Sequence, residues 1–274
     1  MNQVFDRWIE CIRNSEPVAI ATVIERDDAV EGDQALPARL GATLLISRTD
    51  VQGSLGHAQL DAVVTRDANA ALASGHSEAR HYGSAGEARR NDVTVFIEVF
   101  SSPPLMIIFG AVDFTAALVK VAKILGYHVT VCDARAVFAT KQRFPDADEV
   151  VVSWPDAYLK KVADRLGPLD AVCVLTHDHK FDVPAIIEAL STKVGYLGAM
   201  GSRRTHAQRV ERLLDAGVDP PRLHEIMSPI GLAIGARSPE ETAVAICGEI
   251  IARRTNVIAR FLRDDIGPIH PAAT

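Results

Sequence analysis

The segment "GSRRTH" places a glycine and a serine directly before two adjacent arginines, Arg203 and Arg204. Ser202 is a strong helix N-cap candidate, and a helix N-terminus offers unpaired N–H groups and a partial positive charge. Arginines are unfavourable at that end unless an anion pairs with them. With the turn at Gly201, the segment predicts a site for a phosphate or a carboxylate. A solvated pair of surface arginines is the alternative.

The segment "VLTHDHKFD" places imidazole and carboxylate groups after an apolar stretch, at His177, Asp178 and His179. Ligands of α/β proteins bind beyond the carboxyl ends of the parallel strands. Alternate residues in one loop seldom form a metal site without remote ligands, so we expect no metal here. We expect His177 and Asp178 to contact a ligand or to transfer a proton, and a purely structural loop is the alternative.

The segment "IIFGAVDFTAALVKVAKILGYHVTVCDAR" has the layout of a dinucleotide-binding strand–helix–strand unit. Gly110 ends its first apolar run, and Asp133 ends the second, where a ribose-binding acid belongs. Val112 and Thr115 stand where the fingerprint requires glycines, and Asp113 can cap the helix but would repel a phosphate. Val112 therefore disfavours NAD(P) binding, and a nucleotide-binding oxidoreductase is kept as the alternative function.

The loop "PIGLAIGAR" contains Gly231 and Gly235 and precedes a well-marked helix. Ser238, Pro239 and Glu241 form the pattern of a capping box with proline at the first helical position. Apolar loops before capped helices often close over a ligand or a partner. We expect Gly231 and Gly235 to shape such a loop, with a buried structural loop as the alternative.

A region of alternating strands and helices must position these segments. We expect its strands at 105–109, 128–132, 149–152, 171–175 and 194–198. We expect its helices at 113–125, 155–166, 182–190, 202–215 and 239–254. This alternation predicts an α/β fold with a Rossmann-like parallel sheet and helices on both faces.

The prolines of "SSPP" mark the boundary to a smaller N-terminal α+β domain. We divide the chain into an N-terminal domain (1–101), a Rossmann-like domain (102–258) and a tail (259–274). In the first domain we expect a sandwich or a partial sheet. Its elements are a helix at 4–14, strands at 17–25, 41–48, 78–83 and 93–100, and a helix from Ala58. Its turn "GSLGHAQLD" can cradle an anion or simply leave a hairpin.

Composition limits the classes of partner. The formal net charge of −6 argues against broad binding to nucleic acid or anionic membranes. No apolar run approaches the roughly 18 residues of a membrane span, and charges interrupt the first helix, so we expect a cytoplasmic protein. The four cysteines form no CxxC pair, which predicts buried free thiols.

Long motifs identify a family. The segments "YLGAMGSRRTHAQRVERLLDAG" and "PIGLAIGARSPEETAVAICGEIIARR" closely resemble the xanthine dehydrogenase accessory factors, the XdhC/CoxI family. "THDHKFD" and "CDARAVFATKQRFPDADEV" fit the same pattern. The resemblance is strong over roughly 105–256 and weaker in the first domain.

The resemblance implies an accessory protein, often a homodimer, that binds the molybdenum cofactor, a pterin with a dithiolene and a phosphate. Such a protein assists sulfuration of the cofactor with a cysteine desulfurase and inserts it into a molybdenum hydroxylase of the xanthine or carbon monoxide dehydrogenase type. On this interpretation Ser202, Arg203 and Arg204 hold the phosphate. His177, Asp178 and the loop 229–235 line the pocket, and a maturation factor is favoured over a catalyst.

The chain departs from the family pattern at particular positions. Val112 replaces a glycine and Asp113 replaces a histidine in the first turn. Gln59 replaces the cysteine of a glycine-rich run, and Ala233 stands where the family often has an acid. These departures indicate a divergent member.

Overall fold

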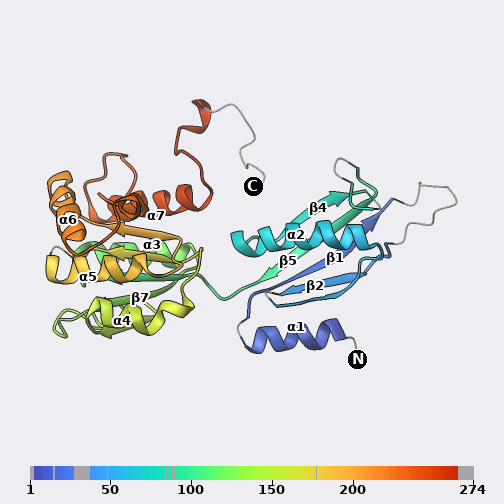
Figure 1. Ribbon diagram of the computed structural model, residues 1–274, viewed down its shortest axis with the longest axis horizontal. Coiled ribbons are helices and arrows are strands. Elements are labelled where there is room, and N and C mark those ends of the chain that lie inside the picture. The colour runs from blue at the N-terminus through green and yellow to red at the C-terminus, as the bar shows by residue number, and fades with distance from the viewer. Residues whose placement is uncertain are drawn as a thin grey trace. The chain divides into compact units, whose positions relative to one another are not determined.

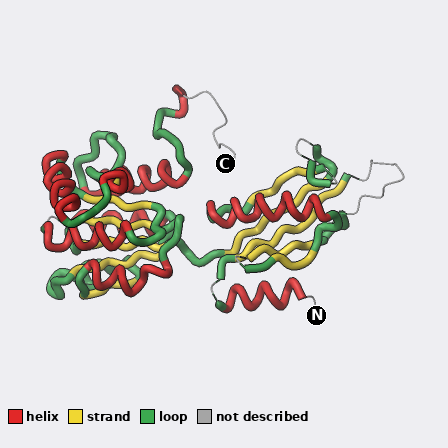
Figure 2. The backbone as a smooth tube through the Cα atoms, in the orientation of Figure 1, coloured by secondary structure: helices red, strands yellow, loops and turns green. Residues whose placement is uncertain are grey.

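A computed structural model describes residues 3–14, 16–27, 38–47, 49–83, 85–87, 90–176 and 178–264 (Figures 1 and 2). The chain divides into two compact units, with the boundary between Ser102 and Pro103. The two prolines at this boundary supply no backbone N–H, so neither sheet can continue through them. Each unit has hydrophobic clusters of its own.

The first unit is one antiparallel sheet with the strand order β3-β2-β1-β5-β4. Its strands are β1 (Val18–Arg26), β2 (Thr43–Ser47), β3 (Val51–Gly53), β4 (Glu78–Tyr82) and β5 (Val93–Phe100). Helix α2 (Ala58–Ser74) packs on one sheet face through Leu60, Val64 and Ala68. Helix α1 (Gln3–Arg13) packs through Val4 and Cys11 in a separate cluster. The expected α+β domain is confirmed, with one sheet rather than a sandwich.

The second unit is a six-stranded parallel sheet with the order β11-β10-β9-β6-β7-β8. Its strands are β6 (Leu105–Phe109), β7 (His128–Asp133), β8 (Glu149–Val152), β9 (Ala171–Val174), β10 (Tyr196–Ala199) and β11 (Ile226–Met227). β6 and β9 are central neighbours from which the chain continues in opposite directions along the sheet. The carboxyl ends of β6 and β9 are therefore a topological switch point.

Helices cover both faces of this sheet, as Figure 2 shows. One face carries α3 (Asp113–Ile124) and α7 (Pro239–Arg254), which pack together. The other face carries α4 (Pro155–Val162), α5 (His179–Leu190) and α6 (Arg203–Asp215). The Rossmann-like prediction is confirmed. Strand β11 is an addition, because two residues are too few to give a periodic pattern.

Helix starts follow the local sequence with two exceptions. Ser202 caps α6, and Ser238 and Glu241 form the expected capping box of α7. Helix α5 begins at His179 rather than 182, because Asp178 caps it by accepting from the Lys180 N–H. Asp113 does not cap α3: Val112 occupies the N-cap position without a side-chain hydrogen bond.

Candidate functional site

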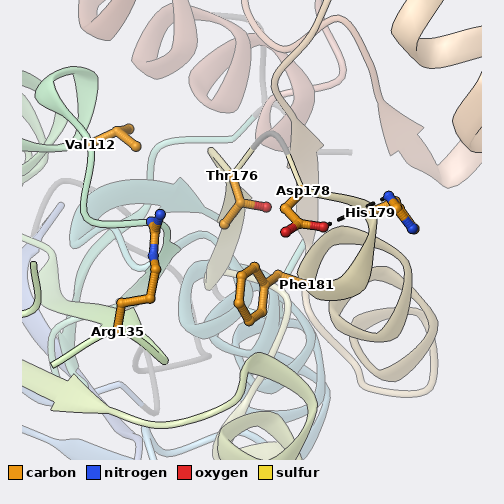
Figure 3. Close-up of a pocket in the computed structure, with 6 residues that line it drawn as sticks. All are labelled: Val112, Arg135, Thr176, Asp178, His179 and Phe181. Carbon is orange, nitrogen blue, oxygen red and sulfur yellow. Dashed lines mark ion pairs between the residues drawn. The ribbon is translucent and has the colours of Figure 1, made fainter.

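A cavity of about 480 Å³ opens at the switch point of the second unit. It is lined by Val112, Arg135, Thr176, Asp178, His179 and Phe181 (Figure 3). These residues come from the turns after β6, β7 and β9 and from the first turn of α5. The sheet topology therefore brings together side chains that are up to 69 positions apart, since carboxyl ends of neighbouring parallel strands share one edge.

Gly110 is the first residue of the turn after β6. Its φ is +110°, a conformation that disfavours any side chain. A Cβ atom there would lie 3.0 Å from both the backbone nitrogen and Cγ2 of Thr176. The hydroxyl of Thr115 donates to the Gly110 carbonyl at 2.5 Å, which ties the turn to α3. Gly110 is thus required by the close approach of β6 and β9, and Thr115 has a structural role in place of a fingerprint glycine.

Asp133 ends β7 but does not offer a free carboxylate. Its oxygens accept from the Ala111 N–H at 2.8 Å and from the Arg135 N–H at 2.9 Å. The Arg135 guanidinium adds two further bonds at 2.9 and 2.8 Å. Burial acts to raise the pKa of Asp133, but the Arg135 and Ala111 bonds outweigh it and hold the pKa below its ordinary value. A ribose hydroxyl would have to displace these donors.

Arg135 is the cationic wall of the cavity. Its side chain is 46% exposed although it is paired with Asp133. The guanidinium lies 4.6 Å from the centre of the Phe138 ring, a cation–π contact that helps to fix its direction. The Asp133 bonds outweigh desolvation and raise the pKa of Arg135, so its charge is permanent. The motif containing Arg135 was noted in the sequence, but no binding role was expected for this residue.

A second arginine braces the turn before α3. Arg143 donates to the Ala111 carbonyl at 3.0 Å and lies 3.7 Å from the carboxylate of Asp113. Asp113 is 93% exposed and points its charge outward. Both backbone groups of Ala111 are thus used within the protein, its N–H by Asp133 and its carbonyl by Arg143. An anion could therefore reach the Ala111 N–H only by displacing Asp133.

Asp178 lies where the sequence placed it, at the cavity. It caps α5 through the Lys180 N–H at 3.0 Å, and its Oδ1 is 3.7 Å from Nδ1 of His179. Figure 3 shows this pair beside Thr176. His177 lies outside the described residues. An acid next to an imidazole can hold or relay a proton at the cavity rim.

Arg203 and Arg204 form the first turn of α6 and are both exposed. The Ser202 hydroxyl accepts from the Thr205 N–H at 3.1 Å. Gly201 has φ +148° and approaches Thr205, which allows the chain to enter the helix. Among the residues that the structure describes, no acid lies within ion-pair distance of either arginine. They lie at the carboxyl edge of β10, one strand from β9, and are not among the residues lining the cavity.

A third arginine of the same motif is buried. Arg209 donates to Asp182 at 3.0 Å, to the Met200 carbonyl at 2.7 Å and to the Ser228 hydroxyl at 3.0 Å. Thr176 donates to the other oxygen of Asp182 by a short hydrogen bond. The network joins α5, α6 and the cavity wall. The sequence held one indication that Arg209 differs from Arg203. The two residues are six positions apart on one helix, so their side chains lie on different faces of that helix.

The loop 229–235 is fastened to α7. The Gly231 N–H donates to Glu249 at 2.9 Å, and the Leu232 N–H donates to the Ala245 carbonyl at 3.1 Å. Ile234 remains exposed, and Gly235 has φ +79° with open space around it. Neither Gly231 nor Gly235 is among the described residues that line the cavity. The part of the loop around Gly231 and Leu232 is therefore structural, and the part around Ile234 and Gly235 is exposed.

The turn before α2 is closed by its own side chains. Asp61 accepts from the Leu55 N–H and from Ser54, both at 2.7 Å, and His57 caps α2. The Leu55 N–H and the Ser54 hydroxyl of this turn are therefore already used, which favours the structural alternative over an anion cradle. Gln59 is exposed on the first turn of the helix.

The four cysteines are free and buried, as the sequence predicted. Burial raises the pKa of Cys132 and of Cys247 to about 12. Such thiols are poor metal ligands and nucleophiles at neutral pH. Within the described ranges, no group of three or more His, Cys, Asp or Glu side chains could hold a metal ion. No described helix is long and apolar enough to cross a membrane.

Family comparison adds to this geometry. The family model "XdhC Rossmann domain" matches residues 106–250, and "XdhC and CoxI family" matches residues 11–83. The resemblance read from the motifs is thereby confirmed. The matches cover parts of both units.

Among curated proteins, a Bacillus subtilis (strain 168) protein named as a probable xanthine dehydrogenase subunit is 36% identical over 163 residues, 60% of this chain and 47% of that protein. The Escherichia coli (strain K12) protein named "Molybdenum cofactor insertion chaperone PaoD" is 33% identical over 99 residues, 36% of this chain and 31% of that one. The matches thus span less than half the length of these relatives.

Among solved structures, one described as a xanthine dehydrogenase from Bacillus halodurans has a TM-score of 0.50 and 21% identity. The match covers 92% of this chain and 94% of that chain. At this identity the likeness concerns the fold alone.

Proposed function

The chain belongs to the XdhC and CoxI family, and from this premise we propose that it binds the molybdenum cofactor and assists its sulfuration and insertion into a molybdenum hydroxylase. The observation that carries the proposal is the cavity at the switch point, with a permanent cation, Arg135, in its wall. The similarity to a protein named as a cofactor insertion chaperone supports it.

The described lining residues fit the organic part of this cofactor. Arg135 can pair with an anionic group, and the Thr176 hydroxyl can accept a hydrogen bond while it donates to Asp182. Phe181 and Val112 offer apolar surface to a ring. None of the described lining residues is a cysteine, so sulfur exchange at molybdenum would rest on the desulfurase. The cofactor, when bound, supplies the molybdenum centre of the client; this chain's residues hold and orient it.

The residues singled out in the sequence have distinct roles in this proposal. Ser202, Arg203 and Arg204 hold the phosphate, which would give the exposed arginines the anion that their helix position requires. Asp178 contacts the ligand from the cavity wall. His177 is proposed beside it on the sequence pattern alone.

The remaining glycines and the acid of the motif set shape the site. Gly110 and Asp133 form its sheet edge, through the close approach to Thr176 and the hold on Arg135. Gly201 and Gly231 permit the turns at which the chain meets α6 and α7, and Gly235 leaves the loop tip free.

The partners are part of the proposal. A molybdenum hydroxylase is the client, a cysteine desulfurase supplies the sulfur, and the chain acts as a homodimer in the cytoplasm. Maturation rather than catalysis is favoured, because the described cavity holds no base paired with an obvious nucleophile. A nicotinamide-dependent oxidoreductase is less well supported, since Asp133 is occupied and Val112 lines the cavity.

The test is cofactor retention. The chain is purified without air from cells supplied with molybdate, then denatured and oxidised, and the released pterin fluorescence and molybdenum are measured. We expect close to one pterin per chain. The Arg203→Ala/Arg204→Ala variant should lose most of it while its circular dichroism is unchanged.

The matched control is Arg253→Ala/Arg254→Ala. It also removes two adjacent exposed arginines, but from the last turn of α7 rather than from the first turn of α6. It changes net charge equally but should retain the cofactor. No pterin in wild-type protein made beside its client and desulfurase would refute the function. Equal retention in both variants would refute only the phosphate placement.

A further inference from the structure

Trp154 contacts Phe181, which lines the cavity, although the two residues come from distant elements. Trp154 follows β8 at the sheet edge, and Phe181 lies in the first turn of α5, which follows β9. Two strands, β6 and β7, separate β8 from β9 in the sheet. The ring centres are nevertheless 5.0 Å apart, with the ring planes tilted by 46°. The pair therefore bridges α4 and α5 on one face of the unit.

Packing and capping do not explain the tryptophan. The residue is 54% exposed, so it contributes little to the core. It occupies the N-cap position of α4 and makes no side-chain cap bond, where Ser, Thr, Asp or Asn would stabilise the helix. Neither burial in the core nor helix capping therefore accounts for a tryptophan at this position, and its contact with Phe181 connects it to the cavity.

The cavity supplies the complementary groups. Phe181 lines it directly, and Figure 3 shows its ring between Arg135 and the Asp178–His179 pair in that view. The face of an aromatic ring in the same cavity as a permanent cation suits a planar heteroaromatic ring that carries an anionic substituent. An uncharged ligand would leave the exposed side of the Arg135 guanidinium without an anionic contact.

We propose that the Trp154–Phe181 pair is the platform on which the planar nitrogen heterocycle of the ligand packs. The inference rests on the proposed function, because it names the part of the ligand that the same cavity recognises. Pterins and purines share this chemistry. The platform makes these two residues determinants of specificity for a ring.

The sequence contains two tryptophans, which makes the test direct. In the Trp8→Phe variant, Trp154 is the sole tryptophan and reports on its contact with Phe181, which lines the cavity. In the Trp154→Phe variant, Trp8 reports on a matched control pair, because its ring centre lies 5.4 Å from that of Phe5 in the first unit. Trp8→Phe keeps an aromatic ring and removes an indole N–H that has no hydrogen-bond partner among the described residues, so the fold should tolerate it.

The probes are 6-hydroxymethylpterin, guanosine monophosphate and ribose 5-phosphate. Binding of each probe is measured separately by equilibrium dialysis. The inner-filter effect of each probe on tryptophan emission is corrected with N-acetyltryptophanamide. We expect at least one ring-bearing probe to quench Trp154 emission, with Trp8 emission unchanged. Ribose 5-phosphate should quench neither.

Phe181→Leu keeps apolar volume and removes the ring. It should weaken binding of the ring-bearing probe by about 10-fold or more, in the range typical of aromatic stacking. Phe5→Leu, the matched control, should not change the affinity. Thermal unfolding of each variant checks its fold.

The outcomes separate this inference from the function. Quenching by the pterin supports both, and quenching by guanosine monophosphate alone supports the platform and counts against the cofactor. A ring-bearing probe that binds without affecting Trp154, or binds Phe181→Leu with unchanged affinity, overturns the platform while cofactor retention can still be observed. Failure of both ring-bearing probes to bind also overturns it.

Discussion

Two carboxylate–arginine pairs at the same sheet edge have opposite surroundings. In the Asp182–Arg209 pair both side chains are buried, with 5% and 3% exposed, and Arg209 has three acceptors from different elements. In the Asp133–Arg135 pair the acid is buried but the arginine is 46% exposed and lines the cavity. Gly110 is close to Thr176, which donates to Asp182, and its own N–H donates to the carbonyl of Cys132, the residue before Asp133.

The difference indicates a division of labour. A buried guanidinium that makes three hydrogen bonds inside the protein holds elements together, and a ligand could reach it only by breaking those bonds. A guanidinium fixed on one side by a buried acid and open on the other is preorganised for an incoming anion. The comparison therefore gives Arg209 a structural role and supports the recognition role proposed for Arg135.

The largest effect should come from Arg209→Met. It leaves the Asp182 carboxylate buried without its cation, which typically costs about 3–5 kcal/mol. Urea unfolding followed by Trp154 emission in the Trp8→Phe background measures it. Arg204→Met on the same helix is the control and should change stability by less than about 0.5 kcal/mol, since Arg204 is exposed. Similar losses in the two variants would contradict the structural role of Arg209.

An intermediate effect is expected for Gly110→Ala, compared with Gly126→Ala. Both glycines have positive φ, +110° and +82°, so both variants carry backbone strain of about 1–2 kcal/mol. Only at Gly110 does the new Cβ meet another strand end, and overpacking there should cost about 1–3 kcal/mol more. Equal free energies of unfolding would show that β6 and β9 separate easily at this point.

The smallest effect is a pH dependence carried by Asp133. Its folded pKa is below the unfolded value of about 3.9, so its contribution is fully present above that pH and is lost as pH falls through the folded pKa. Asp133→Asn should lower stability at pH 7 by about 1–2 kcal/mol, because it removes the charge that Arg135 pairs with.

The difference between wild type and Asp133→Asn should be constant from about pH 7 to 5 and shrink below about pH 4. Urea unfolding at each pH measures it. A difference that grows in acid would mean that Asp133 is not the charged partner of Arg135.

Much of the fold and some of the site could be predicted because the signals are local. Alternating strands and helices, the Ser202 cap and the Ser238–Glu241 capping box depend on residues within a few positions of each other. The same rules failed at Asp113, where the turn is braced by Arg143, 30 positions later. The place of Asp178 soon after a predicted strand also put it at the carboxyl edge of the sheet, where it lines the cavity.

The sequence by itself determined the family, the doubly wound order of elements and the sheet edge at which the cavity lies, because periodicity, caps and long motifs are properties of the chain. Only the tertiary structure decided which arginine is buried, that Asp133 is already occupied, and that Trp154 meets Phe181. Those outcomes depend on side-chain direction and on contacts between elements far apart in the chain, and both arise only when helices pack on the sheet.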